Sequence, residues 1–131
     1  MKGTKPVFLA IAAALFLKLF VFDFIVAQGA SMEPAIPNGT VLIISLVKYG
    51  IRLPLRQEYL IRWAQPRVGE VVVFFTPTGE RAVKRVTAVF PEQGAQVIRF
   101  FAEGDNSLAS YDSRAYGWVS VENIIGKVLG F

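Results

Sequence analysis

Histidine and cysteine are both absent from this chain of 131 residues. The Ser-His and Cys-His pairs that activate most protein nucleophiles are therefore excluded. The two absences also remove the usual ligands of zinc and haem, so we expect no metal and no cofactor. Disulfides are excluded too, although the lack of cysteine does not identify a cellular compartment. If the chain carries out nucleophilic catalysis, a serine activated by a lysine remains available.

A strong excess of one charge is also lacking. The formal net charge is +4, and the first 27 residues supply +2 of it, from Lys2, Lys5 and Lys18 against Asp23. Residues 28–131 therefore carry 11 basic and 9 acidic side chains, a net charge of +2. This bias is too weak to indicate a nucleic-acid partner, and it fits solubility and mild attraction to anionic lipid.

One long apolar run is present, over residues 6–27, and only Lys18 and Asp23 interrupt it. A helix of these 22 residues measures about 33 Å, enough for a hydrocarbon core of about 30 Å. Because Lys2 and Lys5 precede the run, the positive-inside rule places the N-terminus in the cytoplasm. We therefore expect residues 1–27 to form a cytoplasmic N-terminus and single-pass membrane anchor, and residues 28–131 an extracytoplasmic domain.

The alternative for this run is a cleaved secretory signal, because the small residues Ala27, Gly29 and Ala30 follow it. Apolar segments of secretory signals usually have about 7–15 residues, and this run is longer. The length favours an uncleaved anchor.

Beyond the run, short apolar segments separated by turn residues predict a mainly β domain. We expect strands over 41–47, 71–75, 80–89, 96–102 and 124–129, with a hairpin across 71–89 and a bulge or close approach at Gly126. Residues 56–63 fit one or two helical turns or a loop. The apolar residues at 53–55 and 59–63 fit either the bilayer surface or ordinary core packing. With about 100 residues left for it, this domain has room for one core.

Lys84 lies on the apolar face of the expected strand over 80–89. Side chains alternate across a strand, so Lys84 shares its face with Ala82, Val86 and Ala88, and the neighbouring Arg85 lies on the other. A lysine that guards an edge strand against aggregation is one interpretation. The other is a buried amine that acts as a general base. Burial lowers the pKa of a lysine, and without that shift only about one amine in a thousand is neutral near pH 7.4.

Two further segments carry polar side chains of interest. Ser31, in Gln-Gly-Ala-Ser-Met-Glu-Pro, lies shortly after the apolar run. It can be interpreted as a turn cap or as a nucleophile. Residues 104–114 read GDNSLASYDSR, which fits a polar loop. They also supply enough carboxylate, guanidinium and hydroxyl groups to form a hydrogen-bonded shell around a buried amine.

Together these segments resemble the bacterial type I signal peptidases, over roughly residues 1–130. Residues 31–36 (SMEPAI) are similar to the family's Ser-Met-x-Pro-Thr-Leu, and residues 84–86 match its Lys-Arg-Val. Residues 68–74 (VGEVVVF) are similar to its Arg-Gly-Asp segment, and residues 104–117 carry its Gly-Asp-Asn and Ser-x-Asp-Ser-Arg-x-x-Gly signature. The chain departs from the family after Val86, where the usual Gly and Pro-Gly-Asp are missing. With about 20 residues between Lys84 and Gly104, the extra β domain of larger members is absent.

The resemblance implies a signal-peptidase-like β catalytic domain on one transmembrane helix, with Ser31 as nucleophile and Lys84 as general base. It further implies that Ser110 orients the Lys84 amine, that Asp112 and Arg114 hold that loop, and that Asp105 assists. The Ser31 backbone N–H would stabilise the oxyanion, with Gly29 where some members have a hydroxyl and Met32 beside the nucleophile. Val83 would line a pocket for a substrate bound as an added β-strand.

The expected partners are exported preproteins with small residues before the cut, together with the lipid bilayer. We expect a monomer in the cell membrane that removes signal peptides through an acyl-enzyme. Two alternatives remain: a specialised Ser-Lys processing peptidase of a dedicated secretion or conjugation system, and an inactive homologue that binds exported peptides. A self-cleaving repressor shares the dyad, but a DNA-binding region is lacking.

Overall fold

The computed structural model describes residues 3–52, 59–93 and 96–130, apart from the side chains of residues 19 and 20. Its centre is a seven-stranded sheet of order β1-β2-β9-β5-β6-β7-β8, and a second sheet pairs β3 with β4. The strands are β1 (Phe22–Val26), β2 (Val41–Ser45), β3 (Gly50–Arg52), β4 (Tyr59–Arg62), β5 (Val71–Phe75), β6 (Arg81–Phe90), β7 (Arg99–Glu103), β8 (Val119–Ser120) and β9 (Ile124–Gly130). All strand pairs are antiparallel. The chain is therefore mainly β, as expected.

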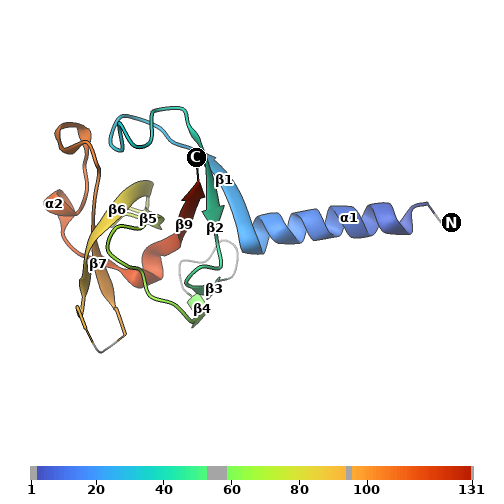
Figure 1. Cartoon of the computed structure of the whole chain (residues 1–131). Helices are drawn as coiled ribbons and strands as arrows, with labels where there is room; N and C mark the ends of the chain where they lie inside the picture. The colour runs from blue at the N-terminus through green and yellow to red at the C-terminus, as the bar shows by residue number, and fades with distance from the viewer. Residues whose placement is uncertain (1–2, 53–58, 94–95, 131) are drawn as a thin grey trace.

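The N-terminal helix differs from the sequence-based expectation. Helix α1 (Lys5–Phe16) continues into a π-helical segment, η1 (Leu17–Val21), and the chain then enters β1. The prediction of one continuous helix through Ala27 is thus wrong over residues 22–27, because β1 pairs with β2 along its whole length. No helix in the described part of the chain is both long enough and apolar enough to cross a bilayer. Helix α1 projects from the β domain with none of its residues buried (Figure 1).

Most of the expected strands are confirmed, including the hairpin of β5 and β6. Gly126 makes the expected close approach, because a Cβ there would lie 2.6 Å from Ile44 Cγ2, and the β5–β9 register shifts beside it. The helical turns considered for 56–63 are wrong over residues 59–62, which form β4. Residues 53–55 lie outside the described residues. Short helical segments complete the fold: η2 (Ser107–Ala109), α2 (Ser113–Tyr116) and η3 (Val121–Asn123).

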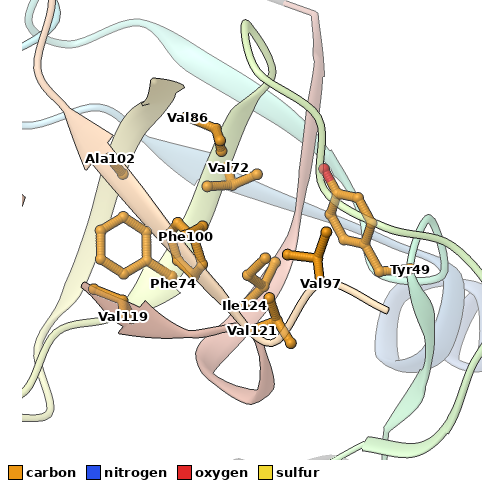
Figure 2. Packing of buried hydrophobic residues seen from close by; sticks show 10 residues of the cluster. All are labelled: Tyr49, Val72, Phe74, Val86, Val97, Phe100, Ala102, Val119, Val121 and Ile124. Carbon is orange, nitrogen blue, oxygen red and sulfur yellow. The ribbon is translucent and has the colours of Figure 1, made fainter. Parts of the chain in front are cut away.

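Strand β5 lies between two clusters of buried apolar side chains, which explains its unbroken apolar sequence. Val72 and Phe74 point into one cluster, and Val71 and Val73 point into the other. Figure 2 shows the first cluster, in which Phe74 meets Phe100 edge to face with ring centroids 5.2 Å apart. The second cluster contains Met32 and therefore anchors the loop between β1 and β2.

Apart from β8, which ends the large sheet on its other side, two backbone edges of that sheet are unpaired in the described part of the chain. β1 is a terminal strand of that sheet. β6 pairs with β7 only from Arg85 onward, so residues 81–84 have no strand on that side. The candidate site lies between these two edges.

Candidate active site

Ser31 and Lys84 meet although they lie 53 positions apart in the sequence. Ser31 lies in the loop between β1 and β2, and Lys84 lies on β6 directly opposite Val72 of β5. Lys84 Nζ donates a hydrogen bond of 2.7 Å to Ser31 Oγ. A serine hydroxyl and an amine at this distance can exchange a proton without further movement.

Lys84 is buried, with 6% of its surface exposed, which agrees with the interpretation as a buried amine and not with that of an exposed edge-strand lysine. Burial lowers the pKa of its ammonium below the usual value of 10.5. The negative charge of Asp112 opposes this shift of the pKa, and the positive charge of Arg114 adds to it. None of the ion pairs among the described residues includes Lys84. The site therefore favours the neutral amine more than a surface position does.

The loop that carries Ser31 is fastened to the segment after β7. The Asn106 backbone N–H donates to the Ser31 carbonyl at 2.9 Å, and its side-chain amide donates to the Ala30 carbonyl at 3.1 Å. The Asp105 N–H donates to Met32 Sδ at 3.4 Å, and Met32 is itself buried. These bonds hold the Ser31 backbone in place from one side.

The other side of this loop is fixed locally. The Gly29 N–H donates to Asn38 Oδ1 at 2.9 Å, and Gly29 has a φ of +85°, a conformation that favours glycine. The backbone N–H of Ser31 makes no hydrogen bond with any residue that the structure describes. This N–H is therefore available to a ligand.

Asp112 forms the centre of a polar network behind Lys84. Its carboxylate is buried and accepts hydrogen bonds from the Gly104 N–H at 2.8 Å and from Ser110 Oγ at 2.5 Å. Arg114 donates to both carboxylate oxygens, from Nε at 3.0 Å and from Nη2 at 2.5 Å. Burial alone raises the pKa of Asp112, but the hydrogen bonds from Arg114, Ser110 and Gly104 together hold it well below the usual range. The carboxylate is therefore ionised at neutral pH.

The structure places the remaining predicted residues in three different relations to the dyad. Ser110 does not bond Lys84 directly; among the described residues, its hydroxyl donates to Asp112. Asp105 forms a two-pronged ion pair with Arg85, at 2.9 Å and 2.8 Å, on the outside of the site. This pairing lowers the pKa of Asp105 and raises that of Arg85. Val83 lies next to Lys84 and packs partly against the second apolar cluster.

Gly104 and Asn106 are structural residues of the site that the sequence reasoning did not single out. A Cβ at Gly104 would lie 2.6 Å from the Ser31 carbonyl oxygen and would also collide with Ser110. The absent side chain therefore lets the Ser31 loop and the Asp112 network approach one another. The Gly-Asp-Asn motif at 104–106 was the only signal of this contact.

A groove of about 1140 Å³ contains both members of the dyad. One wall is β1 with the start of the following loop, and the other is the first part of β6, with Ala109 and Tyr111 alongside.

The Val86–Glu70 and Ala27–Thr40 hydrogen bonds fix which backbone groups of β6 and β1 face outward. By alternation, the N–H and C=O groups of Val83 point away from β5, and those of Phe24 and Val26 point away from β2. Open strand edges of this kind can bind an extended peptide.

Comparison with known proteins agrees with this geometry. Residues 2–93 match the family model described as signal peptidase, peptidase S26. The chain is similar to signal peptidase I of Bacillus caldolyticus, with 26% identity over 156 aligned positions that cover 94% of the chain and 86% of that protein. Signal peptidase I of Pseudomonas fluorescens is 29% identical over 128 positions, which cover 96% of the chain and 40% of that protein. Signal peptidase I of Buchnera aphidicola is 30% identical over 83 positions, with 62% and 26% coverage. The chain thus spans most of the first relative but less than half of the other two.

Proposed function

Because the chain belongs to the signal peptidase family S26 and is a serine peptidase, we propose that it removes N-terminal signal peptides from exported preproteins. In this proposal Ser31 is the nucleophile and Lys84 is the general base. The observation that carries it is the 2.7 Å contact between Lys84 Nζ and Ser31 Oγ, in a chain without histidine or cysteine. The burial of Lys84 supplies the lowered pKa that a lysine base needs.

Acylation begins with Lys84 as the neutral amine, to which the Ser31 hydroxyl donates. Oγ attacks the scissile carbonyl carbon while its proton passes to Nζ. The Oγ–C bond forms, and the carbonyl oxygen becomes the oxyanion of a tetrahedral intermediate. The ammonium of Lys84 then gives the proton to the leaving nitrogen as the C–N bond breaks, which releases the mature protein. Lys84 is neutral again at the acyl-enzyme stage.

Deacylation repeats the cycle with water. Lys84 removes one proton from the water as its oxygen attacks the ester carbon, and that proton passes to Ser31 Oγ as the C–Oγ bond breaks. The signal peptide leaves as a carboxylic acid, which then loses the second water proton to solvent. The free backbone N–H of Ser31 would stabilise the oxyanion in both steps, an effect worth about 3 kcal/mol for one donor. Gly29 and Met32 hold the loop that carries this N–H.

The polar network would act through position. Asp112, held by Ser110, Gly104 and Arg114, fixes the segment against which the Ser31 loop rests. The Arg85–Asp105 pair holds the start of that segment to β6. In this proposal Ser110 assists through Asp112 rather than by bonding the Lys84 amine.

The substrate would enter the groove as an added strand between β1 and β6. The outward-facing backbone groups of Val83 and Val26 would bond to it from opposite sides. Small residues before the cut would fit near Val83, because that side chain partly fills the groove.

We further propose that the helical segment attaches the enzyme to the cell membrane, with the N-terminus in the cytoplasm and the catalytic domain outside. The exposed apolar side chains of α1, such as Phe8 and Leu9, and the lysines at 2 and 5 support this arrangement. Replacing both Phe8 and Leu9 with glutamate should sharply reduce flotation with lipid vesicles. Replacing two exposed uncharged residues of the β domain, Thr78 and Gln93, with glutamate adds the same charge away from α1 and serves as the control.

The direct test uses the full chain in detergent with a preprotein that carries a small-x-small cleavage site. Wild type should cut at that site, and Ser31→Ala and Lys84→Ala should not, while circular dichroism shows all three folded. Cleavage that persists in Ser31→Ala contradicts the proposal. Folded wild type that binds the preprotein without cutting it would favour the peptide-binding homologue, and cleavage restricted to another substrate would favour a specialised peptidase.

A further inference from the structure

Asp23 lies on a wall of the groove, eight residues before Ser31 in the chain. It is one of the two charges that interrupt the apolar run, and the fold places it in β1 rather than in a continuous helix. The proposed reaction at Ser31 and Lys84 does not use it.

The Asp23 carboxylate occupies a backbone group that faces the groove. Asp23 Oδ1 accepts a hydrogen bond of 2.8 Å from the Phe24 N–H. This N–H points away from β2, because the neighbouring odd-numbered residues of β1 form the bonds to β2. It is therefore one of the donors that a strand added to β1 would need.

We propose that Asp23 ends the segment of substrate that the enzyme binds in extended form, by capping the Phe24 N–H. A substrate carbonyl that approaches Phe24 finds its donor occupied and meets a carboxylate oxygen, which is also an acceptor. The outward groups of Val26 and Val83 stay open, so strand pairing continues up to that point and stops there. This inference rests on the proposed function and specifies how much of the signal peptide the groove holds.

The test is a series of peptides with one cleavage sequence and 4 to 12 residues before the cut. For wild type, kcat/KM should rise with length and then become constant where the peptide reaches Asp23. In Asp23→Ala the rise should continue for about two more residues, with a further gain of about twofold to tenfold, the value of one or two hydrogen bonds. Asp23→Asn should keep the wild-type limit, because its side-chain oxygen also accepts from the Phe24 N–H. Glu92→Ala changes the charge equally at an exposed position outside the groove and serves as the matched control.

The ratio of long-peptide to short-peptide values cancels differences in the folded fraction between variants. The inference is overturned if kcat/KM becomes constant at the same peptide length in Asp23→Ala as in wild type. The hydrogen-bonded cap is overturned if kcat/KM becomes constant only at a greater peptide length in Asp23→Asn. If wild type cuts no peptide, or Ser31→Ala cuts them equally, the proposed function itself fails.

A second measurement does not need activity. Hydrogen exchange of the Phe24 amide, followed by NMR in the absence of peptide, should be slower in wild type than in Asp23→Ala. Equal exchange rates would overturn the cap.

Discussion

Lys84 and Arg85 are adjacent basic residues of β6, and the fold treats them in opposite ways. Lys84 is buried, forms no ion pair with a carboxylate among the residues that the structure describes, and bonds a serine hydroxyl. Arg85 is partly exposed and forms a two-pronged ion pair with Asp105 and a bond of 2.9 Å to the Gly69 carbonyl. One strand therefore carries a cation that burial destabilises next to a cation that its partners stabilise.

This contrast indicates how a small domain can favour the neutral form of a lysine. The nearest acidic group in the network, Asp112, is bonded to Arg114 rather than to Lys84. Arg114 opposes the effect of Asp112 on the pKa of Lys84, and the effect of burial, which lowers that pKa, prevails. The pairing of Arg85 with Asp105 likewise keeps a second carboxylate occupied outside the groove.

Exchanging the two kinds of cation gives the largest expected effect. Lys84→Arg places a guanidinium that stays charged in the general-base position, so turnover should fall about a thousandfold or more. Arg85→Lys keeps its charge on the outer side and should leave turnover within a few-fold of wild type. Single-turnover cleavage of a preprotein measures both. Comparable losses in the two variants would contradict the difference between the two positions.

The second prediction concerns the carboxylate behind the dyad. Asp112→Asn leaves the Ser110 and Gly104 donors poorly matched and should lower the free energy of unfolding at pH 7 by about 2–3 kcal/mol. The folded-state pKa of Asp112 lies below its unfolded value, so this stability is present above about pH 4 and is lost as the pH falls further. Urea titrations should therefore show a difference from wild type that is largest at pH 7 and smaller at pH 3. A difference that is constant with pH would contradict the role of the ionised carboxylate.

The Asp112→Asn variant should also lower the pKa of Lys84. Because Asp112 raises the pKa of Lys84, its neutralisation should move the rising limb of the pH–rate profile to lower pH. A shift to higher pH in the folded variant would show that the sign of this interaction is wrong.

The smallest effect is expected from changes to the ion pair between Arg85 and Asp105. Arg85→Ala and Asp105→Ala should each cost about 0.5–1 kcal/mol of stability, since both side chains are partly exposed to water. The double variant should lose less than the sum of the single changes, and high salt should reduce the coupling. Fully additive losses would show that the two side chains do not interact.

Strand alternation was sufficient to place Lys84 on the apolar face of β6 and Arg85 on the other, but it left open whether Lys84 is an edge-strand lysine or a buried amine. For residues 22–26, the apolar content favours the end of a helix over a strand. Phe22, Phe24 and Val26 are exposed, whereas Asp23 and Ile25 are partly buried, so burial alternates along β1. The sequence FDFIV does not follow that alternation, because its exposed positions are apolar. Hydropathy alone cannot distinguish the end of an apolar helix from an apolar edge strand that follows it.

Other parts of the site depend on tertiary contacts that spacing does not encode. The bond between Ser31 and Lys84 follows from the resemblance to a family, not from their separation of 53 positions in the sequence. The fit of Gly104 against the Ser31 carbonyl depends on how two loops meet. The donation of the Ser110 hydroxyl to Asp112, instead of contact with the amine, is likewise a matter of local geometry.

In the proposed mechanism, Lys84 is a buried amine that accepts the Ser31 proton. The most direct measurement is an NMR titration of the Lys84 side chain, assigned by comparison with Lys84→Met, alongside the pH dependence of Ser31 acylation. We expect the pKa of Lys84 to lie below the ordinary value of 10.5. We also expect the acylation rate to rise with pH, with a midpoint equal to that pKa. A pKa at or above 10.5, or acylation that does not follow the titration of Lys84, would contradict it.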